Sequence, residues 1–330
     1  MSEKSPARIS PDRSPLGTSG MEVCGIGLGG NVFGWTADEP SSHRILDAYA
    51  DAGGNLIDTA DGYSHWVPGN AGGESESVIG SWLRGRGRRE RVLIASKVST
   101  KPDRAGLAPA NIRAAAEDSL ARLGVDAIDL YYAHFDDPET PLEETVAAFA
   151  ELVTAGKIRA IGLSNYTPER LSAWFDIAER EGHPLPVALQ PHYNLMEREY
   201  ETGARQIAEQ HGLAVFPYFG LAGGFLTGKY RVEEQARSGP PGDGVPSQRA
   251  ERASRYLSDS GRAVLSALDE ISARHGVPVA SAALAWLRQQ DTVAAPLASA
   301  RTPEQLDALI RSTTVTLSPA ELEQLSGATA

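Results

Sequence analysis

The amino-acid sequence predicts a single-domain (β/α)8 TIM barrel, and three observations support this fold class. Short β-type runs recur along the chain and are apolar almost throughout, as is typical of parallel strands covered on both faces. An amphipathic helical stretch separates consecutive runs. The alternation repeats at a pitch of about 30 residues, which is the spacing expected of the strand–helix units of a barrel. The predicted strands begin near Val23, Asn55, Arg91, Ile128, Ala160, Val187, Ala214 and Thr292.

The helices between these strands carry start and stop signals. Glycines at positions 53–54, 156 and 212 stand where helices should end. In the fourth helical stretch, Leu142, Val146, Phe149 and Leu152 fall on one stripe. Three helix starts combine a capping hydroxyl, a proline at the first helical position and a capping-box partner: Thr140-Pro141-x-Glu143, Thr302-Pro303-x-Gln305 and Ser318-Pro319-x-Glu321.

Two segments fall outside the repeat. Residues 1–13 mix Ser, Pro and opposite charges, which predicts a disordered tail. The barrel domain therefore spans residues 14–330, beginning with a short N-terminal β-hairpin. The pitch breaks between the seventh and eighth strands, where residues 231–252 are rich in Gly, Pro, Ser and charge. We expect a long loop there, at the catalytic end of the barrel, where it could close over a ligand.

Composition excludes several classes of protein. The 330 residues include 31 basic and 43 acidic side chains, so the net charge of −12 opposes a general nucleic-acid or anionic-membrane binder. The single cysteine, Cys24, excludes an intramolecular disulfide and a multi-cysteine zinc site. No apolar run approaches the ~20 residues needed to cross a bilayer, and the first residues lack the apolar core of a secretory signal. We expect a cytoplasmic protein. The sequence does not specify its oligomeric state.

A glycine motif offers a competing fold. The stretch Gly25-Ile26-Gly27-Leu28-Gly29-Gly30 satisfies the G-x-G-x-x-G pattern of Rossmann domains, in which the motif opens a helix that holds a pyrophosphate. Here Asn31-Val32-Phe33-Gly34-Trp35 follows, so a helix cannot start in time. The acidic residue Asp58 also comes later than the ~20-residue spacing of that fingerprint. We interpret the glycines as thinning the wall of the first strand, which leaves room for a bulky group.

Polar residues finish three neighbouring strands that are otherwise apolar. Asp58 ends the second strand, Lys97 the third and His134 the fourth, and Tyr63 follows five residues after the aspartate. Because barrel active sites lie where the strands end, these side chains are expected to share one mouth. The structural alternative, an Asp–Lys salt bridge beside a satisfied histidine, is costly when buried.

These four groups suit proton donation to a carbonyl oxygen. A free tyrosine titrates near pH ~10, which is too weak an acid for this task. A lysine ammonium at ~4 Å in an effective dielectric of ~20 stabilises the phenolate by up to ~4 kcal/mol, or about three pKa units. In this scheme Asp58 holds Lys97 charged, and a neutral His134 directs the carbonyl oxygen toward Tyr63.

The chain resembles the aldo-keto reductases, in the branch that is similar to the potassium-channel β subunits, from about residue 16 to residue 325. The resemblance implies a barrel that binds NADPH or NADP in an extended pose, with NAD as the other possible cofactor. It also implies Asp58, Tyr63, Lys97 and His134 as a catalytic tetrad that reduces an aldehyde or ketone. The motifs that carry it are Asp58-Thr59-Ala60-x-x-Tyr63, Gly73-Glu74-Ser75-Glu76-x-x-x-Gly80, Lys97, His134, Gly156-Lys157-Ile158-Arg159-x-Ile161-Gly162-Leu163-Ser164-Asn165, Gln190 and Thr227-Gly228-Lys229-Tyr230.

The resemblance further assigns cofactor-binding residues. It implies that Ser164, Asn165 and Gln190 hold the nicotinamide carboxamide, whose donor and acceptor edges suit amide and hydroxyl groups, and that Tyr218 stacks on the ring. Arg301, in the loop after the last strand, lies at the usual phosphate site of a barrel and favours the 2′-phosphate of NADPH. The other implied contacts come from Leu221, Gly223, Lys229, Ser299 and Gln305.

Departures from the family pattern affect the cofactor more than the chemistry. Where relatives carry Tyr-Ser-Pro-Leu, this chain has Tyr218-Phe219-Gly220-Leu221, and the frequent Gln-Leu-x-x-Asn becomes Gln305-Leu306-x-x-Leu309. Large apolar residues on loops usually have a ligand or a packing reason. Trp35, Trp66 and Phe135 therefore predict a substrate pocket for a small molecule with an aromatic or sugar-like face.

Two other functions were weighed. A nicotinamide-binding regulatory or redox-sensing subunit would keep the tetrad but turn over slowly and work through a protein partner. A metal-dependent barrel hydrolase would use Asp58, Asp61 and His134, but a lysine beside the cluster opposes a divalent cation. The sequence thus predicts an NADPH-dependent carbonyl reductase without a metal.

Overall fold

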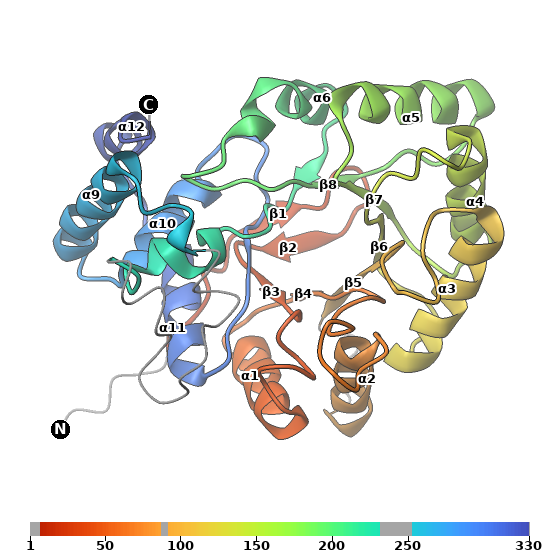
Figure 1. Ribbon diagram of the computed structural model, residues 1–330, viewed down its shortest axis with the longest axis horizontal. Helices are drawn as coiled ribbons and strands as arrows, with labels where there is room; N and C mark the ends of the chain where they lie inside the picture. The colour runs from red at the N-terminus through yellow and green to blue at the C-terminus, as the bar shows by residue number, and fades with distance from the viewer. Residues whose placement is uncertain (1–6, 87–91, 232–252, 330) are drawn as a thin grey trace.

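The computed structural model describes residues 7–86, 92–231 and 253–329, and within these residues eight parallel strands curl into a barrel surrounded by helices (Figure 1). The predicted (β/α)8 fold is confirmed. The barrel strands are β3 (Gly27–Gly29), β4 (Leu56–Asp58), β5 (Leu93–Val98), β6 (Leu130–Ala133), β7 (Ile161–Ser164), β8 (Ala188–Gln190), β9 (Ala214–Val215) and β10 (Leu297–Ala298).

The strands stand around the barrel in chain order, with β10 returning beside β3. Between β9 and β10 the barrel is closed by a short seam rather than by a long ladder. Val215 forms a parallel bridge with Val293. The amide of Ala294 donates to the Val215 carbonyl at 2.9 Å, and that of Leu297 donates to the Pro217 carbonyl at 2.9 Å.

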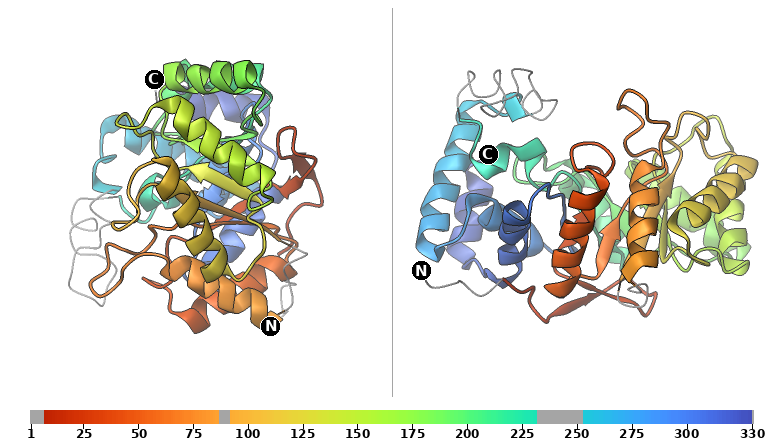
Figure 2. Two further views of the ribbon diagram at one scale, coloured as in Figure 1. Left: turned by 90° about the vertical axis from the view of Figure 1, so that its right-hand side faces the viewer. Right: turned by 90° about the horizontal axis from the view of Figure 1, so that it is seen from below.

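Helices cover the outer face of the barrel, as the three views show (Figures 1 and 2). The predicted stripe of α4 is buried along its whole length. Residues 232–252, which include most of the predicted loop, lie outside the described residues. No helix of the described part is long and apolar enough to cross a membrane. The helices are α1 (Glu39–Asp51), α2 (Glu74–Arg86), α3 (Pro109–Leu123), α4 (Leu142–Thr154), α5 (Pro168–Glu181), α6 (Ala204–Gln210), α9 (Asp259–His275), α10 (Val279–Arg288), α11 (Pro303–Arg311) and α12 (Pro319–Gly327), with 3-10 turns η2 (Glu199–Thr202), η3 (Ala222–Thr227) and η4 (Ser312–Thr314).

The predicted N-terminal hairpin is present and closes the end of the barrel at which the strands begin. Strand β1 (Arg13–Pro15) pairs antiparallel with β2 (Glu22–Cys24), so the first predicted run is divided between β2 and β3. Leu16 and Val23 join the apolar cluster inside the barrel. Figure 2 shows the hairpin crossing below the barrel.

The segment before the hairpin differs from the disordered tail expected over residues 1–13. In its described part, residues 7–13, Ile9 is buried and its amide donates to the Ala52 carbonyl at 3.0 Å. Burial of this apolar side chain offsets the conformational entropy lost by ordering the segment.

The predicted N-terminal cap forms at one helix, α12, and does not form at another, α4. The capping box of α12 is formed, with the Ser318 hydroxyl accepting from the amide of Glu321 and the Glu321 carboxylate accepting from the amide of Ser318. The predicted cap of α4 is wrong, because that helix begins after Pro141 and has no side-chain cap. The Thr140 hydroxyl donates instead to Asp137 Oδ2 at 2.8 Å.

The glycine motif is part of the barrel wall and not of a Rossmann turn. Residues 27–29 form β3, and the next helix starts only at Glu39. A Cβ atom at Gly27 would lie 2.5 Å from the side chain of Leu297, and one at Gly29 would lie 2.6 Å from Ser299 Oγ. The side chain of Leu297 in β10 and that of Ser299, which follows β10, lie in the space that these glycines leave.

Candidate active site

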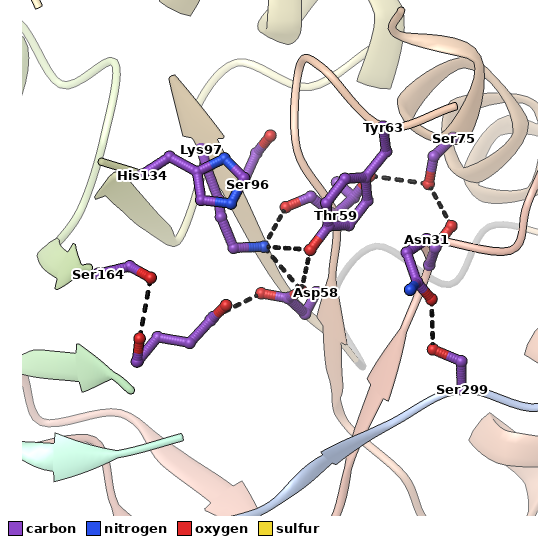
Figure 3. A network of polar contacts seen from close by, with 12 residues as sticks. Asn31, Asp58, Thr59, Tyr63, Ser75, Ser96, Lys97, His134, Ser164 and Ser299 are labelled. Atoms are coloured by element: carbon purple, nitrogen blue, oxygen red, sulfur yellow. Dashed lines mark hydrogen bonds and ion pairs between the residues drawn. The ribbon is translucent and has the colours of Figure 1, made fainter. Parts of the chain in front are cut away.

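The predicted tetrad is brought together at the end of the barrel where the strands finish (Figure 3). Asp58 is the last residue of β4, Lys97 lies near the end of β5 and His134 follows β6 directly. Neighbouring parallel strands end at one edge, so these side chains converge. The Lys97 ammonium donates to Asp58 Oδ2 at 2.7 Å, to the Thr59 carbonyl at 2.8 Å and to Tyr63 Oη at 3.0 Å. Three acceptors thus fix its position beside the phenol.

Burial governs the charges of this group. Desolvation lowers the pKa of the fully buried Lys97, while the Asp58 carboxylate opposes that shift. The sequence argument expected Lys97 to make Tyr63 more acidic. Instead, desolvation and the nearby Asp58 carboxylate raise the pKa of Tyr63 well above 10, and the Tyr63 hydroxyl donates to Asp58 Oδ2 at 3.3 Å. Tyr63 is therefore held as the phenol, which is the form that can donate a proton.

His134 is held beside Tyr63 as a neutral imidazole. The centroids of the two rings lie 6.2 Å apart. Desolvation, followed by the charge of Lys97, lowers the pKa of His134 well below 6.5. Its Nδ1 lies 3.3 Å from the Thr100 hydroxyl, which orients the ring. A neutral ring here can hydrogen-bond a polar atom placed next to the phenol.

Of the three residues predicted to hold a carboxamide, Asn165 and Gln190 bond to the tetrad and Ser164 bonds to both of them. Ser164 ends β7 and Gln190 ends β8. The Gln190 amide donates to Asp58 Oδ1 at 2.9 Å, and the Ser164 hydroxyl donates to the Gln190 carbonyl at 2.8 Å. The side-chain amide of Asn165 donates to the His134 carbonyl at 2.8 Å. The amide-binding residues and the proton-transfer residues therefore form one network.

Tyr218 follows β9 and extends this network. Its hydroxyl donates to Asn165 Oδ1 at 2.8 Å. The ring of His192 is stacked on the Tyr218 ring, with centroids 5.1 Å apart and planes 12° apart. Phe219 meets the Tyr218 ring edge-on and has a φ of +52°, which is unusual for a residue with a Cβ. Tyr218 is thus held by its hydroxyl and by two neighbouring rings, at the place where the resemblance implies stacking on the nicotinamide.

The loop predicted to bind the cofactor phosphate joins β10 to α11. The Thr302 hydroxyl caps α11 by accepting from the Gln305 amide. The Gln305 side chain accepts from the Arg301 amide at 2.9 Å, so the reciprocal half of the predicted capping box is not formed. The Ser299 hydroxyl donates to Asn31 Oδ1 at 2.5 Å, joining this loop to the one after β3. Arg301 Nε is buried and has no hydrogen-bond partner among the described residues.

The remaining predicted cofactor contacts lie around η3. Leu221 precedes this turn, and Gly223 lies inside it with a φ of +67°. Lys229 follows the turn and is exposed, and its ammonium lies 4.8 Å from the centroid of the Tyr230 ring. Among the described residues, no hydrogen bond or ring contact joins this part of the predicted cofactor set to the tetrad, in contrast to Asn165 and Gln190.

The predicted substrate residues place aromatic rings around Tyr63 and His134. Trp66 packs edge-on against both Tyr63 and Trp35, at centroid distances of 6.3 and 5.6 Å. Phe135 lies 5.0 Å from the ring of His134. The exposed fraction is 37% for Trp66 and 46% for Phe135. Exposed rings of this size beside a reactive group are typical of a ligand site.

Sequence reasoning missed several supporting residues. The Thr59 carbonyl and the Thr100 hydroxyl could not be assigned, because backbone acceptors and ring-orienting hydroxyls leave no pattern in a single sequence. His192 stands two residues after Gln190 at the end of the sixth predicted strand, and this position could have found it. Asn31 follows the glycine motif directly, at a predicted strand end, and could have been tested with the other strand-end residues.

The donor set fits a nicotinamide dinucleotide. Amide and hydroxyl groups lie next to the phenol, Tyr218 lies beside Asn165, and the unpartnered Arg301 Nε lies at a capped helix start, where an anionic group is favoured. The set fits a metal poorly. Both carboxylate oxygens of Asp58 already accept from Lys97 or Gln190, so the predicted hydrolase alternative loses its first ligand.

Comparison with known proteins identifies the family. The family model described as "Aldo/keto reductase family" matches residues 25–330. The chain is 34% identical to Protein tas of Escherichia coli, over 93% of this chain and 94% of that protein. It is 34% identical to Aldo-keto reductase YhdN of Bacillus subtilis, over 94% and 91% of the two chains. It is 30% identical to Norsolorinic acid reductase stcV of Emericella nidulans, over 94% and 79%. The chain therefore belongs to the aldo/keto reductase family of oxidoreductases.

Proposed function

We propose that this chain uses NADPH to reduce an aldehyde or ketone to an alcohol, with Tyr63 as the proton donor. The observation that carries the proposal is the Lys97 ammonium 3.0 Å from the Tyr63 hydroxyl, at the mouth of the barrel. When bound, NADPH supplies the hydride that reduces the carbonyl carbon. Ser164, Asn165 and Gln190 would hold its carboxamide, and Arg301 its 2′-phosphate.

The residues of the chain then manage one proton. Tyr63 is the phenol in the resting site, so its proton is available to the oxygen that gains negative charge during reduction. As the proton leaves, negative charge develops on Tyr63 Oη, and the Lys97 ammonium stabilises it. The neutral His134 orients the carbonyl oxygen by a hydrogen bond, and Asp58 keeps Lys97 in place.

The mouth favours a flat apolar substrate. Trp66 and Phe135 are exposed on either side of the Tyr63–His134 pair and would cover the faces of an aromatic aldehyde or ketone. We therefore propose aromatic carbonyls as better substrates than small aliphatic ones.

The test is Tyr63→Phe, assayed with a panel of aromatic and aliphatic aldehydes, ketones, deoxysugars and quinones and with both NADPH and NADH. We expect kcat to fall at least ~100-fold, the lower end for a general acid, with NADPH affinity nearly unchanged. Tyr193→Phe is the matched control, because it also removes a buried tyrosine hydroxyl, one that donates to Glu201. A Tyr63→Phe protein that kept most of its turnover would refute the role of Tyr63. Tight NADPH binding with negligible turnover on the whole panel would instead favour a regulatory subunit.

A further inference from the structure

A second buried acidic cluster lies directly behind the catalytic lysine. Ser96 and Lys97 are neighbours on β5, so their side chains point to opposite faces of the strand. Behind the strand, the Ser96 hydroxyl donates to Glu76 Oε1 at 2.5 Å. Arg122 Nε donates to Glu76 Oε2 at 2.7 Å. Glu76, from α2, is thus buried with both oxygens bonded.

Asp61 joins this cluster without such partners. It is fully buried, and neither of its carboxylate oxygens has a hydrogen-bond partner among the described residues. Its backbone is attached to the catalytic strand, because the Asp61 amide donates to the Lys97 carbonyl at 3.1 Å. It also stands two residues before Tyr63 in the same loop. An ionised carboxylate in this setting is costly, and protonation removes the cost.

The charged groups that face Asp61 come from several elements. Desolvation, followed by the charge of Glu76 from α2, raises the pKa of Asp61 to about 7, while the charge of Arg122, the Gly62 amide and the charge of Lys101 oppose this rise. The charge of Asp61 in turn acts on Lys97 of β5 and on the buried Tyr131 of β6. The one unpartnered carboxyl of this described cluster is thus coupled to the tetrad on the other face of the strand.

We propose that Asp61 is a positioning residue that works as a neutral carboxylic acid, and that its ionisation makes Tyr63 a weaker proton donor. The inference rests on the proposed reductase function. A negative charge on Asp61 would oppose the negative charge that develops on Tyr63 as its proton leaves. Carbonyl reduction should therefore slow as Asp61 loses its proton, and alcohol oxidation, which needs the phenolate, should be slowed too.

The test compares the wild-type protein with Asp61→Asn, which keeps the shape of the side chain but carries no charge. We expect the ratio of kcat for reduction, variant over wild type, to be near 1 at pH ~5.5 and to rise about three- to tenfold by pH ~8.5. The midpoint should lie near pH 7, where Asp61 titrates. Asp118→Asn is the control. It removes an equal charge from Asp118, a half-exposed residue of α3 that pairs with Arg104. Its ratio should stay flat.

A second arm does not depend on activity. Asp61 holds its proton in the folded state up to about pH 7 and releases it near 3.8 when unfolded. The wild-type unfolding equilibrium constant, relative to that of the variant, should therefore rise by up to about tenfold per pH unit between these values and then level off. Should the variant fail to fold, infrared spectra of the wild-type protein decide, since the carbonyl band of a protonated carboxyl should disappear with a midpoint near pH 7.

Each outcome decides the proposal. A flat stability ratio, or no protonated carboxyl near neutral pH, overturns it, because Asp61 is then already ionised. A titrating Asp61 with a flat kcat ratio also overturns it, because the charge then does not reach Tyr63. If neither protein turns over any carbonyl, the reductase function fails and the effect on Tyr63 fails with it, while the stability arm still shows whether Asp61 holds a proton.

Discussion

Replacing Lys97 by Met tests the electrostatic part of the proposed mechanism most directly. The substitution keeps most of the buried chain length but removes the ammonium that lies 3.0 Å from Tyr63 Oη and 2.7 Å from Asp58 Oδ2. At ~4 Å in an effective dielectric of ~20, two unit charges interact by about 4 kcal/mol. The Asp58 carboxylate, left unpaired, would add repulsion toward the phenolate.

Part of this energy is lost to desolvation of the ammonium in the native site. A net effect of about 3 kcal/mol on the transition state remains, which corresponds to a fall in kcat of about 100-fold or more. The pH profile should shift as well, because the phenolate that forms is no longer matched by a cation. The assay is steady-state reduction of an aromatic aldehyde across pH, with NADPH affinity measured by protein fluorescence. Lys157→Met is the control, because it also removes an ammonium, one that pairs with Glu117 of α3. A Lys97→Met protein with more than a tenth of the wild-type kcat and an unchanged pH profile would refute the reasoning.

Three other predictions concern the cofactor, the substrate and stability. Arg301→Ala should weaken NADPH binding about 10- to 100-fold and leave NADH binding unchanged, measured by fluorescence titration, and equal losses for both cofactors would contradict the assignment. Trp66→Ala should raise KM about three- to tenfold for aromatic aldehydes only, with the exposed Leu185→Ala as control. The Ser318 amide, then the His275, Ser318 and Arg274 side chains, lower the pKa of Glu321 from 4.5 to about 2. Because this folded-state pKa is depressed, wild type should lose about 1–2 kcal/mol of stability as pH falls through this window, measured by urea unfolding, and Glu321→Gln should not show this loss.

The fold and the tetrad were predictable because both depend on order along the chain. Apolar runs at a regular pitch specify parallel strands, and a polar residue that ends such a run must lie at the mouth. Asp58, Lys97 and His134 could therefore be brought together before any coordinates were known. The ordered segment around Ile9 could not be foreseen, because one apolar residue in a polar stretch gives no periodic signal.

Charge states were less accessible to sequence reasoning. The expectation that Lys97 would acidify Tyr63 considered one pair of charges and left out burial and the bond from Tyr63 to Asp58. Asp61 shows the same limit. Its position two residues before Tyr63 was visible, but its burial without a hydrogen-bond partner and its closeness to Glu76 of α2 depend on the folded structure.

The short seam between β9 and β10 has a consequence for how the protein responds to its cofactor. Each of these strands has two residues, so few backbone hydrogen bonds join the two strands of the seam. Tyr218 follows β9 and Ser299 follows β10. A dinucleotide that contacts both Tyr218 and Ser299 would span the short seam between β9 and β10. Its binding would then stabilise the closed barrel. The part of the barrel that opens most readily is then the part that a bound cofactor would stabilise.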